Sequence, residues 1–142
     1  MKTRTARRRG PTRAMLEAMT ALAKDARERA HAPYSGFRVG AALKTRTGEI
    51  VTGCNIENAS FGLTLCAERV AVFKAISEGL TGFDAIVVVA ASKRTTAPCG
   101  PCRQILWEFC GDILVHMVSP RGRARTTRLR ELLPLPFDGG SL

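Results

Sequence analysis

The sequence predicts one α/β domain of three layers, in which a mixed sheet of about five strands lies between helices on both faces. The chain has 142 residues, which suits a single hydrophobic core. Amphipathic segments alternate with short apolar segments along it. One of these, DAIVVVAA at 84–91, is apolar throughout, as is typical of a strand buried on both faces. Such a strand needs helices above and below the sheet.

Helical periodicity is clearest in the first of these segments. Over 14–30, apolar residues recur at spacings of three and four, and charged residues fill the other positions. Pro11 and Thr12 stand where this helix would begin. Gly79 follows the second helix, and Pro101 stands at the first position of the third. The expected helices are 14–30, 65–77, 102–109 and 128–133.

Short segments between the helices are expected to form the strands. The first two are joined by the turn Thr47-Gly48, and a link this short predicts a hairpin. The last strand lies in an arginine-rich stretch, 121–130, which alternates charged and small residues and so favours a solvated edge strand. The expected strands are 37–44, 49–54, 84–91, 113–119 and 123–127.

Much of the basic charge lies at the N-terminus. Removing residues 1–13, which contain no acid, lowers the formal net charge from +10 to +4. Glu17 and Asp25 interrupt the next stretch, which therefore differs from a secretory signal peptide. We expect 1–13 to be a disordered basic tail and 14–142 to form one domain. A transit peptide and a nucleic-acid contact are the other interpretations of the tail.

The cysteines indicate a reducing compartment. An odd number of them, without a signal peptide, argues against a disulfide scaffold and favours a cytoplasmic protein. No apolar run reaches the roughly 18 residues of a membrane span, so we expect no membrane partner. Cys54 ends a strand and Cys110 ends a helix, and both are expected to be small core residues. The full set is Cys54, Cys66, Cys99, Cys102 and Cys110.

Three of these cysteines form a pattern that indicates a metal. Cys99 and Cys102 make a C-x-x-C pair in PCGPC, and Cys66 lies 33 residues before Cys99. A C-x-x-C pair alone also marks redox and structural zinc sites. The expected helices place Cys66 and Cys102 in first turns, where thiolates are stabilised. Three protein ligands with one open position are typical of catalytic zinc, and Glu68 could move protons beside it.

The motifs together resemble a known family. C-A-E followed by P-C-x-x-C is the signature of the zinc-dependent deaminases, in the form with cysteine in place of histidine. The resemblance to the small homotetrameric cytidine deaminases runs from about Ala14 to Phe137 and implies their cytidine deaminase-like fold. The similar stretches are PYSGFRVGAAL (33–43), GCNIENASFGLTLCAERVAVFKAISEG (53–79), PCGPCRQILWEF (98–109) and ELLPLPF (131–137).

This resemblance implies a zinc-dependent hydrolysis. Cys66, Cys99 and Cys102 would bind one Zn²⁺ per subunit, with water or hydroxide as the fourth ligand. Glu68 would take the water's proton, the hydroxide would attack C4, and Glu68 would then protonate N3 and the leaving amine. Cytidine and 2′-deoxycytidine would become uridine and 2′-deoxyuridine, with release of ammonia. Because three thiolates outweigh the charge of Zn²⁺, Arg69 would offset the excess.

Substrate contacts are implied in the same way. Asn55 and Glu57, in the pattern N-x-E, would bind the 3′-hydroxyl of the ribose. Phe37 would pack on the pyrimidine. The backbone N–H of Ala67 would bind the pyrimidine O2, and the backbone of Ala97 the exocyclic amine.

Phe137 resembles a residue that reaches into the site of a neighbouring subunit. The resemblance therefore implies a homotetramer with composite active sites. Phe61 departs from the family pattern, which commonly has tyrosine there.

Three other functions stay open from the residues alone. A deaminase of a cytosine-bearing antibiotic such as blasticidin S would lack the ribose pattern of Asn55 and Glu57. A nucleic-acid editor would need a basic groove and stacking aromatics, whereas this chain has six Phe, one Trp and one Tyr. A non-enzymatic zinc protein would have no need of Glu68. We therefore expect a small nucleoside as substrate and no nucleic-acid partner.

Overall fold

The computed structural model describes residues 10–142. The expected basic tail, 1–13, lies mostly outside the described residues. The first helix begins at Arg13, one residue before the expected start of the domain. Within the described part of the chain, no helix is long and apolar enough to cross a membrane.

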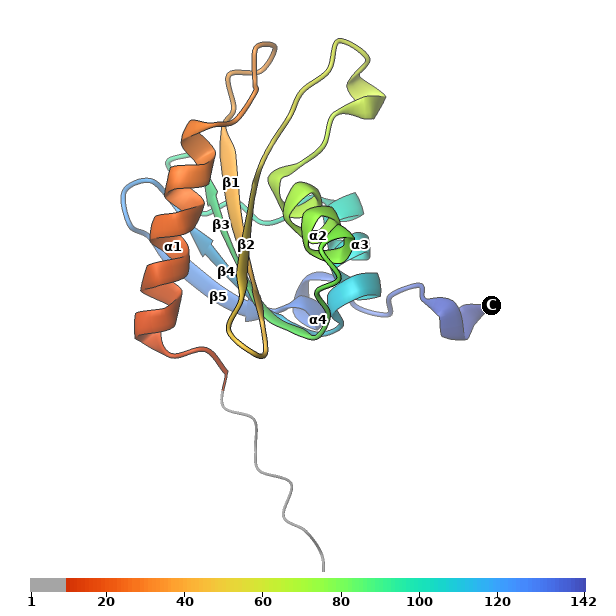
Figure 1. Cartoon of the computed structure of the whole chain (residues 1–142). Helices are drawn as coiled ribbons and strands as arrows, with labels where there is room; N and C mark the ends of the chain where they lie inside the picture. Colours follow the sequence, from red (N-terminus) through yellow and green to blue (C-terminus); the bar gives the residue numbers. More distant parts are fainter. Residues whose placement is uncertain (1–9) are drawn as a thin grey trace, which may run out of the picture.

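The strands form one mixed sheet in the order β2-β1-β3-β4-β5 (Figure 1). β3 and β4 are parallel, and the other neighbours are antiparallel. This confirms the predicted five-stranded mixed sheet. β3 is buried along almost its whole length, as its apolar sequence predicts, and the arginine-rich β5 is an exposed edge strand. The strands are β1 (Val39–Thr45), β2 (Ile50–Cys54), β3 (Phe83–Ala90), β4 (Leu114–Val118) and β5 (Ala124–Arg128).

Helices cover both faces of the sheet, with α1 on one face and α2 and α3 on the other (Figure 1). The alternation of side chains along the strands produces these layers. On β3, Val87 and Val89 pack in the cluster that contains α1, while Ile86 and Val88 pack in the cluster of α2 and α3. The helices are α1 (Arg13–Glu28), α2 (Ala67–Ser77), α3 (Gly100–Cys110) and α4 (Leu129–Leu132), with 3₁₀ turns η1 (Phe61–Leu63) and η2 (Gly139–Ser141).

Two helix starts differ by two residues from the sequence prediction. Leu65, expected in the second helix, is extended and exchanges backbone hydrogen bonds of 2.9 and 3.0 Å with Ile56. α2 therefore starts at Ala67, directly after Cys66. α3 starts two residues earlier than expected, directly after Cys99. Cys66 and Cys99 are thus extended N-cap residues, and the prediction that Cys66 lies inside a helical turn is wrong.

Two glycines let helices lie directly against the sheet. A Cβ atom on Gly40 would lie 1.9 Å from the carbonyl oxygen of Ala23 in α1. A Cβ atom on Gly53 would lie 2.5 Å from the carbonyl oxygen of Ala67 and 2.6 Å from the nitrogen of Ala71, both in α2. Because backbone atoms make these contacts, no side chain fits. Gly53 thus allows the start of α2 to approach β2.

We predict that Gly53→Ala destabilises the fold by about 1–3 kcal/mol, because the added methyl group overpacks the contact between β2 and α2. Urea unfolding of the zinc-loaded protein measures this as a lower midpoint at an unchanged slope. Gly62→Ala is the matched control, since nothing lies within 4 Å of a Cβ atom at Gly62. Equal midpoints for the two variants would contradict the packing argument.

Candidate active site

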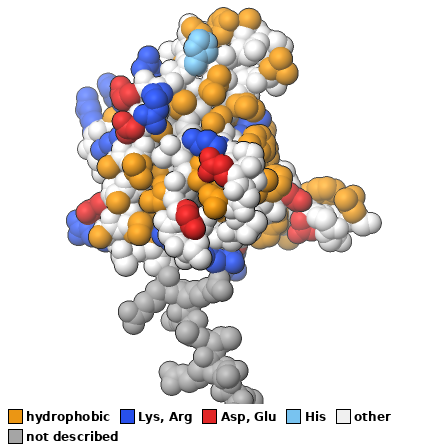
Figure 2. Space-filling view, in the orientation of Figure 1, with side chains coloured by type: hydrophobic (Ala, Val, Ile, Leu, Met, Phe, Trp, Pro, Cys, Tyr) orange, Lys and Arg blue, Asp and Glu red, His pale blue; other side chains and the backbone are white. Residues whose placement is uncertain are grey.

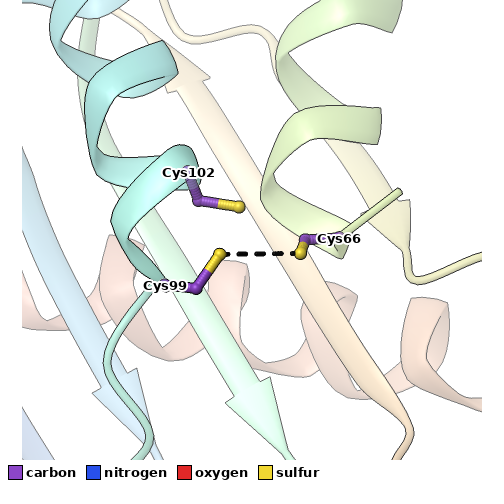
Figure 3. Close-up of side chains that lie close together, drawn as sticks. All are labelled: Cys66, Cys99 and Cys102. Carbon is purple, nitrogen blue, oxygen red and sulfur yellow. Dashed lines mark hydrogen bonds between the residues drawn. The ribbon is translucent and has the colours of Figure 1, made fainter. Parts of the chain in front are cut away.

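Three cysteine sulfurs converge where α2 and α3 begin (Figure 3). Cys66 precedes α2, Cys99 precedes α3, and Cys102 lies in the first turn of α3. Their three Sγ atoms all lie within 4.8 Å of one another. The Sγ atoms of Cys66 and Cys99 are 3.8 Å apart, far beyond the roughly 2.05 Å of a disulfide bond. The predicted set of metal ligands is therefore brought together as free thiols.

The donor set fits zinc. With Zn–S bonds of about 2.3 Å and tetrahedral angles, two sulfur ligands of one Zn²⁺ lie about 3.8 Å apart. The Sγ atoms of Cys66 and Cys99 have this separation. Three thiolates would fill three of the four tetrahedral positions and leave one open, as catalytic zinc requires.

The surroundings of the thiols favour thiolates. Two helix N-termini point at them, and the partial positive charge there stabilises anions. The pKa of the Cys66 thiol is lowered to about 5, chiefly by interaction with Cys102 and in part by a hydrogen bond from Arg69. The same interaction, together with burial, raises the pKa of the Cys102 thiol. Metal binding would release the protons that the thiols still carry.

Glu68 is a buried carboxyl beside the sulfurs. Its side chain is 5% exposed, and its Oε2 lies 3.4 Å from the Sγ of Cys102. Burial raises the pKa of Glu68 above its ordinary value. A carboxyl with a raised pKa holds a proton more readily than an exposed one, which suits a group that acts as both general acid and base.

Arg69 contacts a sulfur rather than the neighbouring carboxylate. Its Nη2 lies 3.4 Å from the Sγ of Cys66 and also donates to the carbonyl of Thr64 at 3.3 Å. The hydrogen bond to Cys66 raises the pKa of Arg69. Among the described residues, Arg69 and Glu68 form no ion pair, and the buried Nε of Arg69 has no hydrogen-bond partner. The guanidinium is thus placed to offset thiolate charge.

A cavity of about 170 Å³ opens beside the sulfurs. Both Cys66 and Cys99 line it, together with Glu68. Four of the six residues predicted to contact substrate also line it, namely Phe37, Asn55, Ala67 and Ala97. The sequence prediction missed other lining residues that have no chemical signature of their own, including Val39, Thr64, Leu65, Val88 and Thr96.

Asn55 also holds the backbone at the cavity wall. Its Oδ1 accepts from the N–H of Val39 at 2.8 Å, and its Nδ2 donates to the carbonyl of Phe37 at 2.7 Å. These bonds fix the backbone on both sides of Arg38. An amide side chain has a second N–H and a second lone pair, so Asn55 retains a donor and an acceptor for a ligand.

Glu57 lies just outside this cavity, in an adjoining hollow with Tyr34, Ser35 and Phe61. Thr64 lines both spaces. The carboxylate of Glu57 accepts from the N–H groups of Tyr34 and Ser35 at 2.9 and 3.1 Å and from the hydroxyl of Ser35 at 2.5 Å. The bond from the Ser35 hydroxyl chiefly lowers the pKa of Glu57. Glu57 is therefore an ionised group in a fixed position.

Phe137 does not line the cavity of its own chain. Its side chain is 61% exposed, and its carbonyl accepts from Nε2 of Gln104 at 2.7 Å. Of the two cysteines outside the triad, Cys110 is buried as expected, and burial raises the pKa of its thiol to about 12. Cys54 is only half-buried, so the prediction of a core position is wrong there.

Residues 13–117 match the family described as the cytidine and deoxycytidylate deaminase zinc-binding region. This chain belongs to that deaminase family. The resemblance read from the motifs is confirmed, and the zinc centre of the family corresponds here to Cys66, Cys99 and Cys102.

Similar members of the deaminase family are known. A cytidine deaminase of Halalkalibacterium halodurans is 51% identical, over 79% of this chain and 86% of its own. Another, of Sporosarcina psychrophila, is 46% identical, over 87% of this chain and 91% of its own. The crystal structure of cytidine deaminase from Burkholderia pseudomallei superposes with a TM-score of 0.83 at 46% identity. This superposition covers 85% of this chain and 98% of the Burkholderia pseudomallei chain.

Proposed function

We propose that the chain is a cytidine deaminase, which converts cytidine and 2′-deoxycytidine with water to uridine and 2′-deoxyuridine plus ammonia. One observation carries the proposal: a buried carboxyl and two thiols of a zinc-type triad form the wall of one small cavity. The level of identity to the cytidine deaminases described above supports the same activity.

Zinc would be held by the three thiolates of Cys66, Cys99 and Cys102. When bound, it lowers the pKa of a water molecule and so makes a nucleophile available at neutral pH. The protein's own contribution is to keep the three sulfurs in place and to leave one side of the triad open to the cavity.

Glu68 is the proposed proton carrier. It would take a proton from the attacking water and deliver protons to N3 of the ring and to the departing amine. Its burial beside Cys102 raises its pKa, which lets it serve first as base and then as acid. The bond formed joins C4 to oxygen, and the bond broken joins C4 to the amine nitrogen, which leaves as ammonia.

The cavity wall would orient the nucleoside. Phe37 would pack on the pyrimidine ring. The N–H of Ala67 lies in the first turn of α2, where it has no partner within the helix, and would donate to the pyrimidine O2. The backbone of Ala97 would contact the exocyclic amine. Asn55 and Glu57 would bind the 3′-hydroxyl, which cytidine and 2′-deoxycytidine share.

We predict that Glu68→Gln lowers turnover by about 10²–10⁴-fold, the range expected for loss of a general acid and base. The variant should keep its zinc, because Glu68 is not a ligand. The loss of cytidine absorbance with time measures turnover, and metal analysis of the same samples measures zinc.

The same assay tests the proposed function. If zinc-loaded wild-type protein leaves both cytidine and 2′-deoxycytidine unchanged, the proposed function is refuted. Blasticidin S and a single-stranded RNA, offered in parallel, distinguish an antibiotic deaminase and an editor from a nucleoside deaminase.

We propose that Arg69 tunes the charge of the zinc centre. Three thiolates on Zn²⁺ leave a net charge of −1, which weakens the ability of the metal to acidify water. The hydrogen bond from Arg69 to the Sγ of Cys66 withdraws part of this charge. The absence of an ion pair with Glu68 among the described residues leaves Arg69 available for this role.

Arg69→Ala should therefore lower turnover more than zinc occupancy. The zinc ligands remain, whereas the thiolate charge is no longer offset. Turnover and bound zinc are compared on one preparation. Unchanged turnover at full zinc occupancy would contradict the proposed role.

We also propose a cytoplasmic homotetramer, without a membrane or nucleic-acid partner, in which Phe137 completes a neighbour's site. Apolar side chains are exposed on the two loops beside the cavity and on the projecting C-terminal segment (Figure 2). Phe61 is 74% exposed, Leu63 67% and Phe137 61%. Phe61 and Leu63 lie on one 3₁₀ turn, and neighbouring exposed apolar side chains of this kind mark protein contacts.

We predict that the wild-type protein sediments as a tetramer of four chains of 15.4 kDa each.

We also predict that Phe137→Ala raises the KM for cytidine by up to about tenfold, because the aromatic contact with the neighbouring site is lost. Leu142→Ala, which removes another exposed apolar side chain of the same segment, should leave KM unchanged. A fully active monomer would refute the composite site.

A further inference from the structure

The three cysteines differ in how packing holds them. Cys102 is completely buried, and Cys66 is half-buried at the start of α2. Cys99 is exposed. It follows residues 91–98, which are neither helix nor strand. Surrounding side chains therefore do little to fix Cys99, and its position depends on the hydrogen bonds of its backbone.

Arg103 makes those hydrogen bonds. Its backbone N–H donates to the carbonyl of Cys99 at 3.0 Å. Its side-chain Nε donates to the carbonyl of Pro98 at 2.7 Å. The two carbonyls belong to the peptide groups immediately before and after the Cα of Cys99. A single residue thus holds both peptide groups that set the direction of this thiol.

The same guanidinium is itself fixed at its far end. Nη1 of Arg103 donates to the carbonyl of Leu132, the last residue of α4, at 2.7 Å. Hydrogen bonds from a charged donor at this length are among the stronger ones in proteins. The side chain therefore forms a bridge from α4 to Pro98, and the half-buried guanidinium cannot swing away without losing both bonds.

We propose that Arg103 is a positioning residue of the zinc centre, which holds Cys99 in the place required of a third ligand. The inference rests on the zinc triad and is independent of which nucleoside is the substrate. No hydrogen bond joins Arg103 to a cysteine sulfur within the described part of the chain. Arg103 thus acts through geometry, whereas Arg69 acts through charge.

The bridge needs a guanidinium. The planar group of arginine presents Nε and Nη donors in a fixed arrangement, and here each serves a carbonyl from a different segment of the chain. The ammonium of lysine is a single point at the end of a flexible stem. Arg103→Lys would keep the positive charge but lose the simultaneous contacts with Pro98 and Leu132.

The test is the rate at which zinc leaves the folded protein. Zinc-loaded protein is mixed with an excess of the coloured chelator 4-(2-pyridylazo)resorcinol at neutral pH, and the complex is followed by absorbance. Loss of a residue that orients a metal ligand typically costs about 10–100-fold in metal affinity. We expect Arg103→Ala and Arg103→Lys both to release zinc about 10–100-fold faster than the wild type.

Gln104→Ala is the matched control. Gln104 is the next residue of α3 and also tethers the C-terminal segment, through the carbonyl of Phe137, but among the described residues its side chain makes no hydrogen bond to the segment before Cys99. Its zinc release should equal that of the wild type. Thermal unfolding of the metal-free proteins records any general loss of stability separately.

Two results would overturn the proposal. Wild-type release rates in Arg103→Ala, whether or not its metal-free form unfolds at a lower temperature, would show that Arg103 only anchors α4. A wild-type rate in Arg103→Lys would show that positive charge suffices. Should Arg103→Ala fail to fold, Arg103→Lys against Gln104→Ala decides the question alone.

Discussion

The structure depends most on the attraction between thiolate sulfur and the positive ends of two helices. α2 and α3 both begin with an extended cysteine, and the N–H groups of their first turns face the triad. Three negative groups would otherwise repel one another at these distances. The sheet makes the arrangement possible, because Gly53 lets the backbone of α2 approach β2 without an intervening side chain. The geometry of the zinc-type centre thus depends on how closely the helices pack against the sheet.

In our proposals, two arginines stabilise the centre by different means. Arg69 reaches the Sγ of Cys66 and acts on its charge. Arg103 reaches the carbonyls of Pro98 and Leu132 and acts on the position of Cys99. The two proposed roles complement each other, because excess negative charge lowers the acidity of a metal-bound water and a displaced ligand weakens the hold on the metal. Neither arginine is paired with a carboxylate among the described residues, so both stay available for these contacts.

The sequence allowed the chemistry to be predicted further than the geometry. The spacing of Cys66, Cys99 and Cys102, with Glu68 beside them, identifies the triad because ligands on two helix starts leave a recognisable pattern. The sheet could be predicted from hydrophobic alternation. The bridge from Arg103 to Leu132 could not be, since it joins segments 29 residues apart and depends on where α4 ends. The same holds for the amide of Asn55, whose bonds form only once β1 and β2 are paired.

Much of the hold on the loop from Tyr34 to Val39 comes through its main chain. Asn55 and Glu57 contact the N–H groups of Tyr34, Ser35 and Val39 and the carbonyl of Phe37. Three side chains of the loop add to this: the hydroxyl of Ser35 donates to Glu57, the guanidinium of Arg38 donates to the carbonyl of Glu28 at 3.2 Å, and the ring of Tyr34 packs edge-on against Phe61. Main-chain groups are the same whatever residue carries them. Phe37 contributes only its N–H and carbonyl to these bonds, while its side chain lines the cavity. That side chain can therefore change during evolution and alter the entrance to the cavity without loosening its wall, which leaves substrate preference free to drift while the catalytic centre stays constant.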